Sequence, residues 1–176
     1  MSELKKPNLA IIVAMTKDRV IGIREENKIP WYIPEDFKHF KETTLNSTVI
    51  MGKTTWDSLP KKPLPKRNNI VLCNDNPDFE YAGIDVVSKI DDALIGAEHY
   101  GVNTFIMGGA SIYRVFLPLV NKMIISFVKG DYKGDVYFPD FRLKEWDITQ
   151  ETEHPEFIVK VHERKRPVDY SNIFKR

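Results

Sequence analysis

The chain alternates short apolar runs with amphipathic helical patterns from Leu9 to Val128. Runs that are apolar at nearly every position are typical of strands buried on both faces, as in a parallel or mixed sheet with helices on each side. These runs are LAIIVAM from Leu9, TVIMG from Thr48, NIVLC from Asn69, IDVVS from Ile84, TFIMGG from Thr104 and MIISFV from Met123. The segments between them predict crossover helices over residues 34–44, 53–59, 90–100 and 110–120.

The pattern changes after Val128. Residues 129–144 form a polar connection, and the segments WDITQETE and FIVKVHERK then predict an antiparallel strand pair joined through His154 and Pro155. The sequence therefore predicts an α/β fold, in which a mixed, mostly parallel β-sheet is flanked by helices and ends in an antiparallel strand pair.

Length and charge narrow the class of protein. At 176 residues and 20.5 kDa, the chain can bury a sizeable core without a disulfide or a metal. We expect a single domain over residues 1–176, with a polar N-terminal extension at residues 1–8 and a basic, aromatic C-terminal tail at residues 166–176. The net charge of +1 gives no reason to expect a nucleic-acid partner or a polybasic membrane anchor.

The cysteine content and the N-terminus indicate the compartment. The single cysteine, Cys73, lies in the apolar run NNIVLC, so we expect a buried structural thiol and no disulfide scaffold. The opening MSELKKPN is polar, and LAIIVAM is too short to span a membrane and lacks a small-residue cleavage site. We therefore expect a cytoplasmic protein.

The segment KIPWYIPEDFKHFK places an acid among large apolar residues. Positions i, i+3, i+4 and i+7 of the predicted helix stripe are Ile33, Asp36, Phe37 and Phe40. A charged residue is rarely buried unless it is paired, and no Lys or Arg shares this stripe within one turn. Two interpretations stay open: Asp36 is an early-turn acid favoured by the helix dipole, or it lies in an apolar cleft where desolvation raises its pKa and it binds the amidine-like edge of a planar heterocycle.

Two glycine-containing segments each link a predicted strand to a helix. In NTFIMGGASIYRVFLP, Gly108 and Gly109 let a ligand approach the backbone, and free N–H groups at the next helix start favour a phosphate. The spacing is not that of the Rossmann fingerprint. In VIMGKTTWDSLP, Gly52 precedes a similar helix start, but Ser47 stands where a Walker A motif needs a glycine. Two such helix starts on one sheet suit the two ends of a dinucleotide.

Other polar residues give weaker indications. The four histidines show no metal-ligand spacing, and we expect surface or core positions for His39, His99, His154 and His162. No metal site is predicted. The planar fork of Arg67, in the loop before NIVLC, can hold a substrate carboxylate, although a lone loop Arg is usually a solvated surface residue.

Taken together, these segments resemble the dihydrofolate reductase family, in order from Leu9 to about Lys165. The matching blocks are DRVIG after the opening strand, IPW, IPEDFKHFK, VIMGKTTWDSLP, PLPKRNNIVL, FIMGGASIY and GDVYFPDF. Their joint occurrence is highly specific: a Pro-Trp, an acid two residues after a second Pro, M-G-basic-x-T-W and Gly-Gly. The resemblance implies a dihydrofolate reductase-like fold.

The resemblance also implies an activity and its partners. The activity is NADPH-dependent reduction of 7,8-dihydrofolate to 5,6,7,8-tetrahydrofolate, which supplies one-carbon carriers for thymidylate and purine synthesis. The implied partners are the cofactor NADPH, the substrate dihydrofolate and antifolate inhibitors, with no nucleic acid, membrane or metal. We expect a monomer.

Site residues follow from the same resemblance, position by position. Asp36 is implied to hydrogen-bond the pterin edge and promote protonation through water, with Ser126 beside it where the family usually has Thr. Trp31 and Tyr113 are implied to lie near the reacting rings. The implied substrate-binding residues are Ile12, Val13, Ala14, Phe37, Phe40, Ser58, Leu59, Leu64, Arg67 and Met107. The implied cofactor-binding residues are Ala14, Ile21, Gly22, Gly52, Lys53, Thr54, Thr55, Leu72, Asn74, Lys89, Gly108, Gly109, Ala110, Ser111, Ile112 and Tyr113.

The chain departs from the family pattern at two places. Lys53 is the one clear base expected at the ribose 2′-phosphate, Asp75 adds an unfavourable charge there, and Lys89 is a candidate second cation. These departures concern the preference for NADPH over NADH and not the expected hydride transfer. The segment at residues 22–28 is about two residues longer than in bacterial relatives, so the loop over the nicotinamide is expected to close differently.

Two alternative functions remain open at this point. A reductase of the riboflavin pathway has a similar fold and acts on a phosphorylated ribosylaminopyrimidine, but the acid of IPEDF and the Arg of PKRNNI favour folate. The other alternative is a binding protein, which would be either a nucleotide-binding module without chemistry or a subunit whose tail recruits a partner. Asp36 argues against both of these binding proteins, because they have little use for a carboxylate on an apolar stripe.

Overall fold

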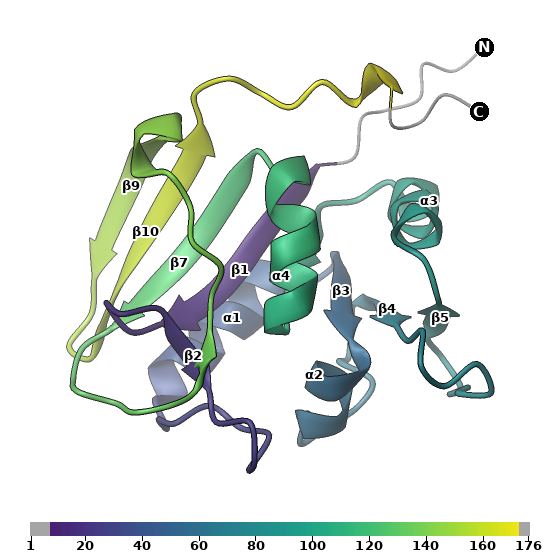
Figure 1. The fold of residues 1–176 in the computed structure, drawn as a ribbon, viewed down its shortest axis with the longest axis horizontal. Coiled ribbons are helices and arrows are strands. Elements are labelled where there is room, and N and C mark those ends of the chain that lie inside the picture. The colour runs from purple at the N-terminus through teal and green to yellow at the C-terminus, as the bar shows by residue number, and fades with distance from the viewer. Residues whose placement is uncertain (1–7, 173–176) are drawn as a thin grey trace.

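The computed structural model describes residues 8–172, so residues 1–7 of the predicted extension and 173–176 of the predicted tail lie outside it. Eight described strands form one twisted sheet in the order β5-β4-β3-β6-β1-β7-β10-β9 (Figure 1). The strands are β1 (Leu9–Met15), β3 (Thr48–Gly52), β4 (Asn68–Leu72), β5 (Asp85–Val87), β6 (Thr104–Ile106), β7 (Lys122–Val128), β9 (Trp146–Glu153) and β10 (Phe157–Arg164).

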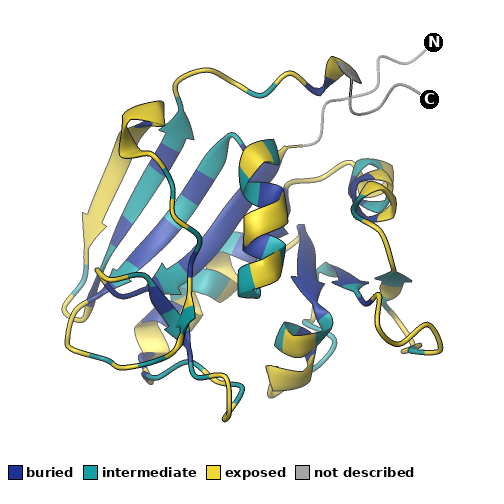
Figure 2. Ribbon diagram, viewed as in Figure 1, coloured by how far each residue is buried: buried dark blue, intermediate teal, exposed yellow. Residues whose placement is uncertain are grey.

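The direction of the strands agrees with the predicted architecture. Neighbouring strands from β5 to β7 are parallel, and β10 is antiparallel to both β7 and β9. The central strands β1 and β3 are buried at almost every position, whereas the outer strand β9 is exposed along most of its length (Figure 2). The prediction of a mostly parallel sheet with an antiparallel ending is confirmed.

Helices cover both faces of this sheet. They are α1 (Pro34–Thr44), α2 (Lys53–Ser58), α3 (Ile90–Tyr100) and α4 (Ala110–Phe116). Alternate residues of β1 face the two helical layers. Ile12 lies in the cluster that contains Trp56 of α2 and against which Phe40 of α1 packs, whereas Ile11 lies in the cluster that contains residues of α3 and α4. Figure 1 shows α4 in front of the sheet and α1 behind it.

The fourth predicted helix was too long. α4 ends at Phe116 and a 3-10 turn, η1 (Leu117–Leu119), follows it, instead of one helix to Val120. Pro118 is the physical reason, because proline lacks the N–H that an α-helix needs and clashes with the preceding turn. α2 likewise stops at Ser58, one residue before the predicted end.

The polar connection before β9 contains structure that the sequence pattern did not predict. β2 (Val20–Gly22) and β8 (Val136–Tyr137) pair as a small antiparallel sheet. Gly134 makes this pairing possible, since a Cβ there would lie 2.4 Å from the carbonyl oxygen of Gly22. A second short turn, η2 (Leu143–Glu145), leads into β9.

The described part of the C-terminal tail packs against the body of the protein. The backbone N–H of Val168 donates to Asn121 Oδ1 at 2.7 Å, and the buried Tyr170, in η3 (Tyr170–Asn172), donates its hydroxyl to the carbonyl of Leu119. Cys73 is a buried free thiol, as predicted. Among the described residues, no helix has the length and apolar character to span a membrane.

Candidate active site

The first helix, α1, buries Asp36 more deeply than the aromatic residue next to it. Pro34 starts α1 at the position where a missing N–H costs nothing, and Ile33 precedes it in an extended conformation. Asp36 is 8% exposed, whereas Phe37 on the same stripe is 45% exposed. The stripe therefore faces two environments, an enclosed one at Asp36 and an open one at Phe37.

The Asp36 carboxyl lies against β7 and two histidines. Burial raises the pKa of Asp36, and a hydrogen bond from the Ser126 side chain opposes that rise, as do the charges of His39 and His154. Ser126 is level with Ala14 on β1 and with Val159 on β10, so three strands meet beside the acid. The predicted neighbourhood of Asp36 and Ser126 is present in the structure.

Trp31 lies in the same enclosed region. Its side chain is buried with Ile33 in a cluster against which Ala14 packs, and its ring meets Tyr132 edge-on at 5.6 Å. The indole N–H has no hydrogen-bond partner among the described residues. A buried donor without a partner is uncommon, and a bound ligand or water is the usual partner of such a group.

Tyr113 reaches the end of β1 from α4, on the other face of the sheet. Its hydroxyl donates to the carbonyl of Ile12 at 2.8 Å, and burial raises the pKa of Tyr113 far above its usual value. Such a phenol keeps its proton, so Tyr113 can position the backbone of β1 but not supply a proton. Val13 belongs to the core cluster on the Tyr113 side, so its side chain faces away from the cluster that contains Ile12.

The predicted substrate residues gather on the α1 and α2 face. Four of them are partly buried and pack against one core cluster: Phe40, Leu59, Leu64 and Met107. Arg67 lies at the end of this apolar surface, where its Nε donates to the carbonyl of Pro65 and its Nη1 to Thr44 Oγ1, both at 3.0 Å. These two bonds fix the plane of the guanidinium, which leaves a planar fork suited to a carboxylate.

The two glycine segments meet at the carboxyl ends of β3 and β6. The N–H of Gly52 donates to the carbonyl of Gly108 at 2.8 Å, and the Gly108–Gly109 peptide bond is cis. A Cβ on Gly52 would lie 2.9 Å from Ile112, and a Cβ on Gly108, whose φ is +121°, would lie 3.3 Å from Thr55 Oγ1. Glycine is therefore required at both positions, and the starts of α2 and α4 lie next to each other as the prediction for a dinucleotide needs.

Residues predicted for the adenosine end follow the next two strands. Leu72 and Asn74 lie at the carboxyl end of β4, and Lys89 precedes α3 just after β5. Lys53 is already paired: its Nζ lies 2.6 Å from Asp57 Oδ1 and 4.6 Å from the centre of the Phe79 ring. A phosphate bound by Lys53 would compete with Asp57, which the sequence analysis did not foresee.

The loop that follows β2 contacts the start of α2. The N–H of Ile23 donates to the carbonyl of Lys28 at 2.8 Å, which closes the segment into a turn next to Ile21 and Gly22. Asn27 Nδ2 donates to the carbonyl of Thr54 at 3.0 Å. The loop predicted to cover the nicotinamide thus touches the segment predicted to hold the cofactor.

Sequence reasoning did not predict that two histidines, His39 and His154, lie near enough to Asp36 for their charges to act on its carboxyl. The spacing of His39, three residues after Asp36 on α1, was a signal that it shares the acid's side of the helix. His154 comes from the turn between β9 and β10, far away in the sequence, so no local pattern pointed to it.

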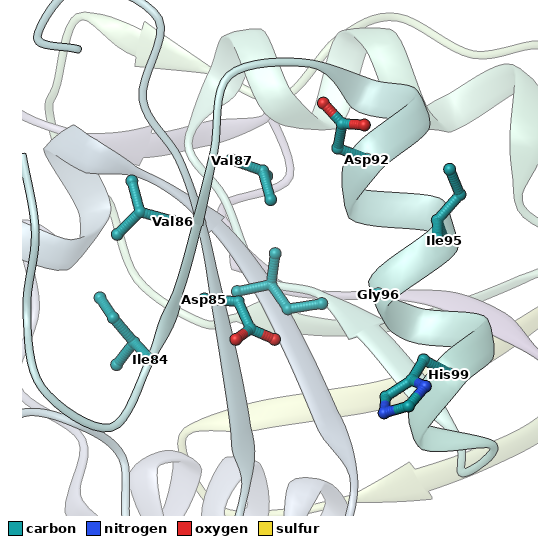
Figure 3. A pocket seen from close by; sticks show the side chains of 9 residues that line it. Ile84, Asp85, Val86, Val87, Asp92, Ile95, Gly96 and His99 are labelled. Atoms are coloured by element: carbon teal, nitrogen blue, oxygen red, sulfur yellow. The ribbon is translucent and has the colours of Figure 1, made fainter.

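A separate hollow of about 550 Å³ lies between α3 and β5 (Figure 3). Its lining consists of Ile70, Ile84, Asp85, Val86, Val87, Asp92, Ile95, Gly96 and His99. None of the predicted site residues is among them. Tyr100 already donates its hydroxyl to Asp85 Oδ2 at 2.7 Å, so one of the polar groups of the hollow has a partner. We do not assign the active site to this hollow.

Comparison with known proteins identifies the family. The family model described as Dihydrofolate reductase matches residues 8–166. The chain belongs to the dihydrofolate reductase family. The matched range agrees with the resemblance that the motifs indicated from Leu9 to about Lys165, and that prediction is confirmed.

Individual members of the family are similar over most of their length. The dihydrofolate reductase of Buchnera aphidicola subsp. Acyrthosiphon pisum is 43% identical over 136 residues, which are 77% of this chain and 81% of that protein. The dihydrofolate reductase of Staphylococcus aureus (strain Mu50) is 36% identical over 145 residues, or 82% of this chain and 86% of that protein. A solved dihydrofolate reductase from Enterococcus faecalis, complexed with NADP(H) and RAB-propyl, superposes with a TM-score of 0.82 at 28% identity, covering 92% of this chain and 98% of that one.

Proposed function

We propose that Asp36 is the group that binds the pterin edge of dihydrofolate and promotes its protonation in the reaction catalysed by this chain. The chain is an NADPH-dependent dihydrofolate reductase, which reduces 7,8-dihydrofolate to 5,6,7,8-tetrahydrofolate. The observation that carries the proposal is the burial of the Asp36 carboxyl beside Ser126, in surroundings that raise its pKa. A carboxyl whose pKa is raised toward neutrality can hold and release a proton near working pH.

The remaining predicted residues support a consistent placement of the substrate. Asp36 lies in the first turn of α1 and Arg67 bonds Thr44 at the end of the same helix, and Phe40, Leu59 and Leu64 pack against one core cluster. A pterin at Asp36 and a glutamate carboxylate at Arg67 would place the p-aminobenzoyl group along those apolar side chains. Ala14 lies near the carboxyl end of β1, two residues after Ile12, and Met107 directly follows β6; an open α/β sheet binds its ligands at these strand ends.

The cofactor site fits NADPH at its pyrophosphate end. The close approach of Gly52 and Gly108 leaves no room for a side chain, and the turn leads directly into α4, whose first N–H groups lack intrahelical acceptors and so suit a phosphate. Bound NADPH supplies the hydride. Ala110 and Ser111 start α4 beside this turn, Thr55 packs against it, and Lys53 would bind the ribose 2′-phosphate after leaving Asp57.

The test compares two early-turn acids in matched helices. Asp36→Asn keeps size and hydrogen bonding but removes the ionisable proton, so hydride transfer at neutral pH should fall by roughly 10² to 10⁴ and recover as pH falls. Asp91→Asn, at the first turn of α3, should leave the rate unchanged. Single-turnover loss of reduced-nicotinamide absorbance with dihydrofolate separates this chemistry from product release. If Asp36→Asn kept near-parental rates of hydride transfer from acid to neutral pH, that result would contradict the proposed role.

We also propose that residues 1–176 form a single domain that acts as a cytoplasmic monomer, binds antifolate inhibitors at the substrate site and has no nucleic-acid partner. The continuous sheet and the tail that packs against η1 support a single domain. The buried Cys73, a free thiol, suits a reducing compartment. Sedimentation of the full chain tests the monomer, and competition between an antifolate and dihydrofolate tests the shared site.

A further inference from the structure

His39 places an imidazole beside the proposed catalytic acid. It follows Asp36 by three residues on α1, and its Nε2 is buried and has no hydrogen-bond partner among the described residues. The other ring nitrogen, Nδ1, lies 3.5 Å from Thr43 Oγ1, a distance at the limit of a hydrogen bond. The ring is 6.4 Å from the ring of the fully buried Phe157. This imidazole is held by packing more than by polar contacts.

His154 approaches the same acid from the opposite end of the chain. Its ring stacks on Phe157 with centroids 4.3 Å apart and an interplanar angle of 8°. Its backbone is fixed as well, because its N–H donates to the carbonyl of Phe157 at 2.9 Å and its carbonyl accepts from Lys129 Nζ at 2.9 Å. Two histidines thus lie against one aromatic ring next to Asp36.

Charged groups lie around these imidazoles on α1, on β9 and just after β7. Lys129 Nζ, which bonds the His154 carbonyl, is also 3.0 Å from Glu153 Oε1 at the end of β9. From α1, Glu35 Oε1 lies 3.5 Å from His154 Nδ1, and the charge of Glu42 acts on His39. From β7, Ser126 hydrogen-bonds Asp36. The two imidazoles repel each other when both are charged, and each attracts the Asp36 carboxylate. The result is a set of interacting charges around the Asp36 carboxyl.

We propose that His39 and His154 are positioning residues that set the pH range of hydride transfer, by placing protonatable imidazoles beside the Asp36 carboxyl. This inference rests on the proposed role of Asp36. A carboxyl enclosed only by apolar groups would keep its proton over a wide pH range, because desolvation disfavours the anion. Imidazolium charge favours the anion and thereby limits that effect.

The consequence is a particular shape of the pH profile. Burial lowers the pKa of His39, so its charge accumulates only as the solution becomes acidic. In that range each added imidazolium charge makes Asp36 harder to protonate. The fraction of protonated Asp36 should therefore rise more gradually with falling pH than for an isolated carboxyl, and the rate of hydride transfer should follow it.

Phenylalanine replacements test this at nearly constant shape. His39→Phe and His154→Phe keep a planar ring against Phe157 and remove the imidazole nitrogens that can carry charge. In single-turnover hydride transfer of the full chain, each variant should move the midpoint of the rate profile upward by roughly 0.5 to 1 pH unit. The double variant should give the larger shift and a steeper, single-proton curve. His99→Phe on α3, next to Tyr100, is the matched control and should move nothing.

The maximum rate distinguishes positioning from a structural role. A structural role would lower the rate by the same factor at every pH and leave the midpoint in place, which would overturn the proposal. Where a phenylalanine variant fails to fold, His39→Gln, which keeps polar atoms but carries no charge, should show the same upward shift.

A direct titration separates this inference from the proposed function. The carboxyl carbon of Asp36, observed by NMR in protein labelled at aspartate, should titrate at higher pH in both phenylalanine variants, whatever its catalytic role. If Asp36→Asn loses hydride transfer but the histidine variants leave the midpoint and the NMR titration unchanged, the inference fails alone. If Asp36→Asn keeps its rate, the proposed role of Asp36 fails, while a shifted NMR titration would still support the charge coupling.

Discussion

Two helices of equal length, α1 and α3, illustrate how similar sequence patterns serve different purposes. Both span 11 residues, and both carry two acids in the first turn, Glu35 and Asp36 in α1 and Asp91 and Asp92 in α3. The acids of α3 are exposed, where a carboxylate near the positive end of a helix is favourable. In α1 the second acid is buried instead.

The rest of each helix shows the same contrast. α3 directs Ala93, Leu94 and Ala97 into the core, which is the usual use of an apolar stripe. α1 buries Asp36 and Thr44 and leaves the Phe37 ring 45% exposed. A helix that encloses a carboxylate and exposes an aromatic ring gains little stability from its packing. Such an inversion is expected at a functional surface and agrees with the substrate site proposed above, whereas α3 mainly supports the sheet.

The largest effect should come from removing packing at α3. Leu94→Ala empties a fully buried position and should lower the free energy of unfolding by about 2–5 kcal/mol, with little change in the rate constants of the folded enzyme. Phe37→Ala on α1 should change stability by less than about 1 kcal/mol but raise the Michaelis constant for dihydrofolate roughly tenfold, or about 1.4 kcal/mol. Urea denaturation and steady-state kinetics of both variants check this. Equal loss of stability in the two would remove the contrast between the helices.

The second effect concerns the C-terminal end of α1. Thr44 ends the helix and accepts a hydrogen bond from Arg67. The helix therefore positions the guanidinium that we propose to bind the substrate carboxylate. Arg67→Leu should raise the Michaelis constant for dihydrofolate by about 10- to 100-fold, as expected for a lost charge-assisted pair, and leave turnover at saturation nearly intact. A carboxylate remote from the reacting ring binds similarly in the ground and transition states.

Arg67→Lys is the matched control for that prediction. It keeps the charge but not the planar fork, so it should fall between the parent and Arg67→Leu. The measurement is steady-state kinetics with dihydrofolate over a wide range of concentrations. A large loss of turnover at an unchanged Michaelis constant would contradict the proposed role of Arg67.

Most of the fold was predictable because local patterns determine it. The bounds of α1 and α3 agree with their predicted ranges, since Pro34 fixes one start and Gly101, in the left-handed conformation, fixes one end. The strands buried on both faces were recognisable as continuous apolar runs. The β2–β8 pair was missed because both strands are very short and depend on the close approach at Gly134.

The site was predictable only in part. Asp36 could be singled out because a carboxylate on an apolar stripe breaks the expected pattern. Which of its two interpretations applies depends on the tertiary structure, since β7 brings Ser126 and the β9–β10 turn brings His154. The pairing of Lys53 with Asp57, four residues later, follows a known helical spacing and could have been predicted.

The smallest effect, and the one that separates α1 from α3 by its sign, concerns the stability of the acid variants. Burial raises the pKa of Asp36, so the folded protein binds this proton more tightly than the unfolded chain, whose carboxyl has its usual value of 3.8. The folded state is therefore favoured most below that pH, and the free energy of unfolding decreases as pH rises through the raised pKa.

Asp36→Asn removes this decrease. At neutral pH the variant should be more stable than the parent by roughly 0.5–2 kcal/mol, although its hydride transfer should be slower, and the two stabilities should converge below about pH 4. Asp91→Asn should instead become slightly less stable at neutral pH, because an exposed acid at a helix start is favourable. Urea denaturation from acid to neutral pH measures both. A loss of stability in Asp36→Asn equal to that in Asp91→Asn would show that Asp36 is only an early-turn helix acid, and that α1 and α3 use their first turns in the same way.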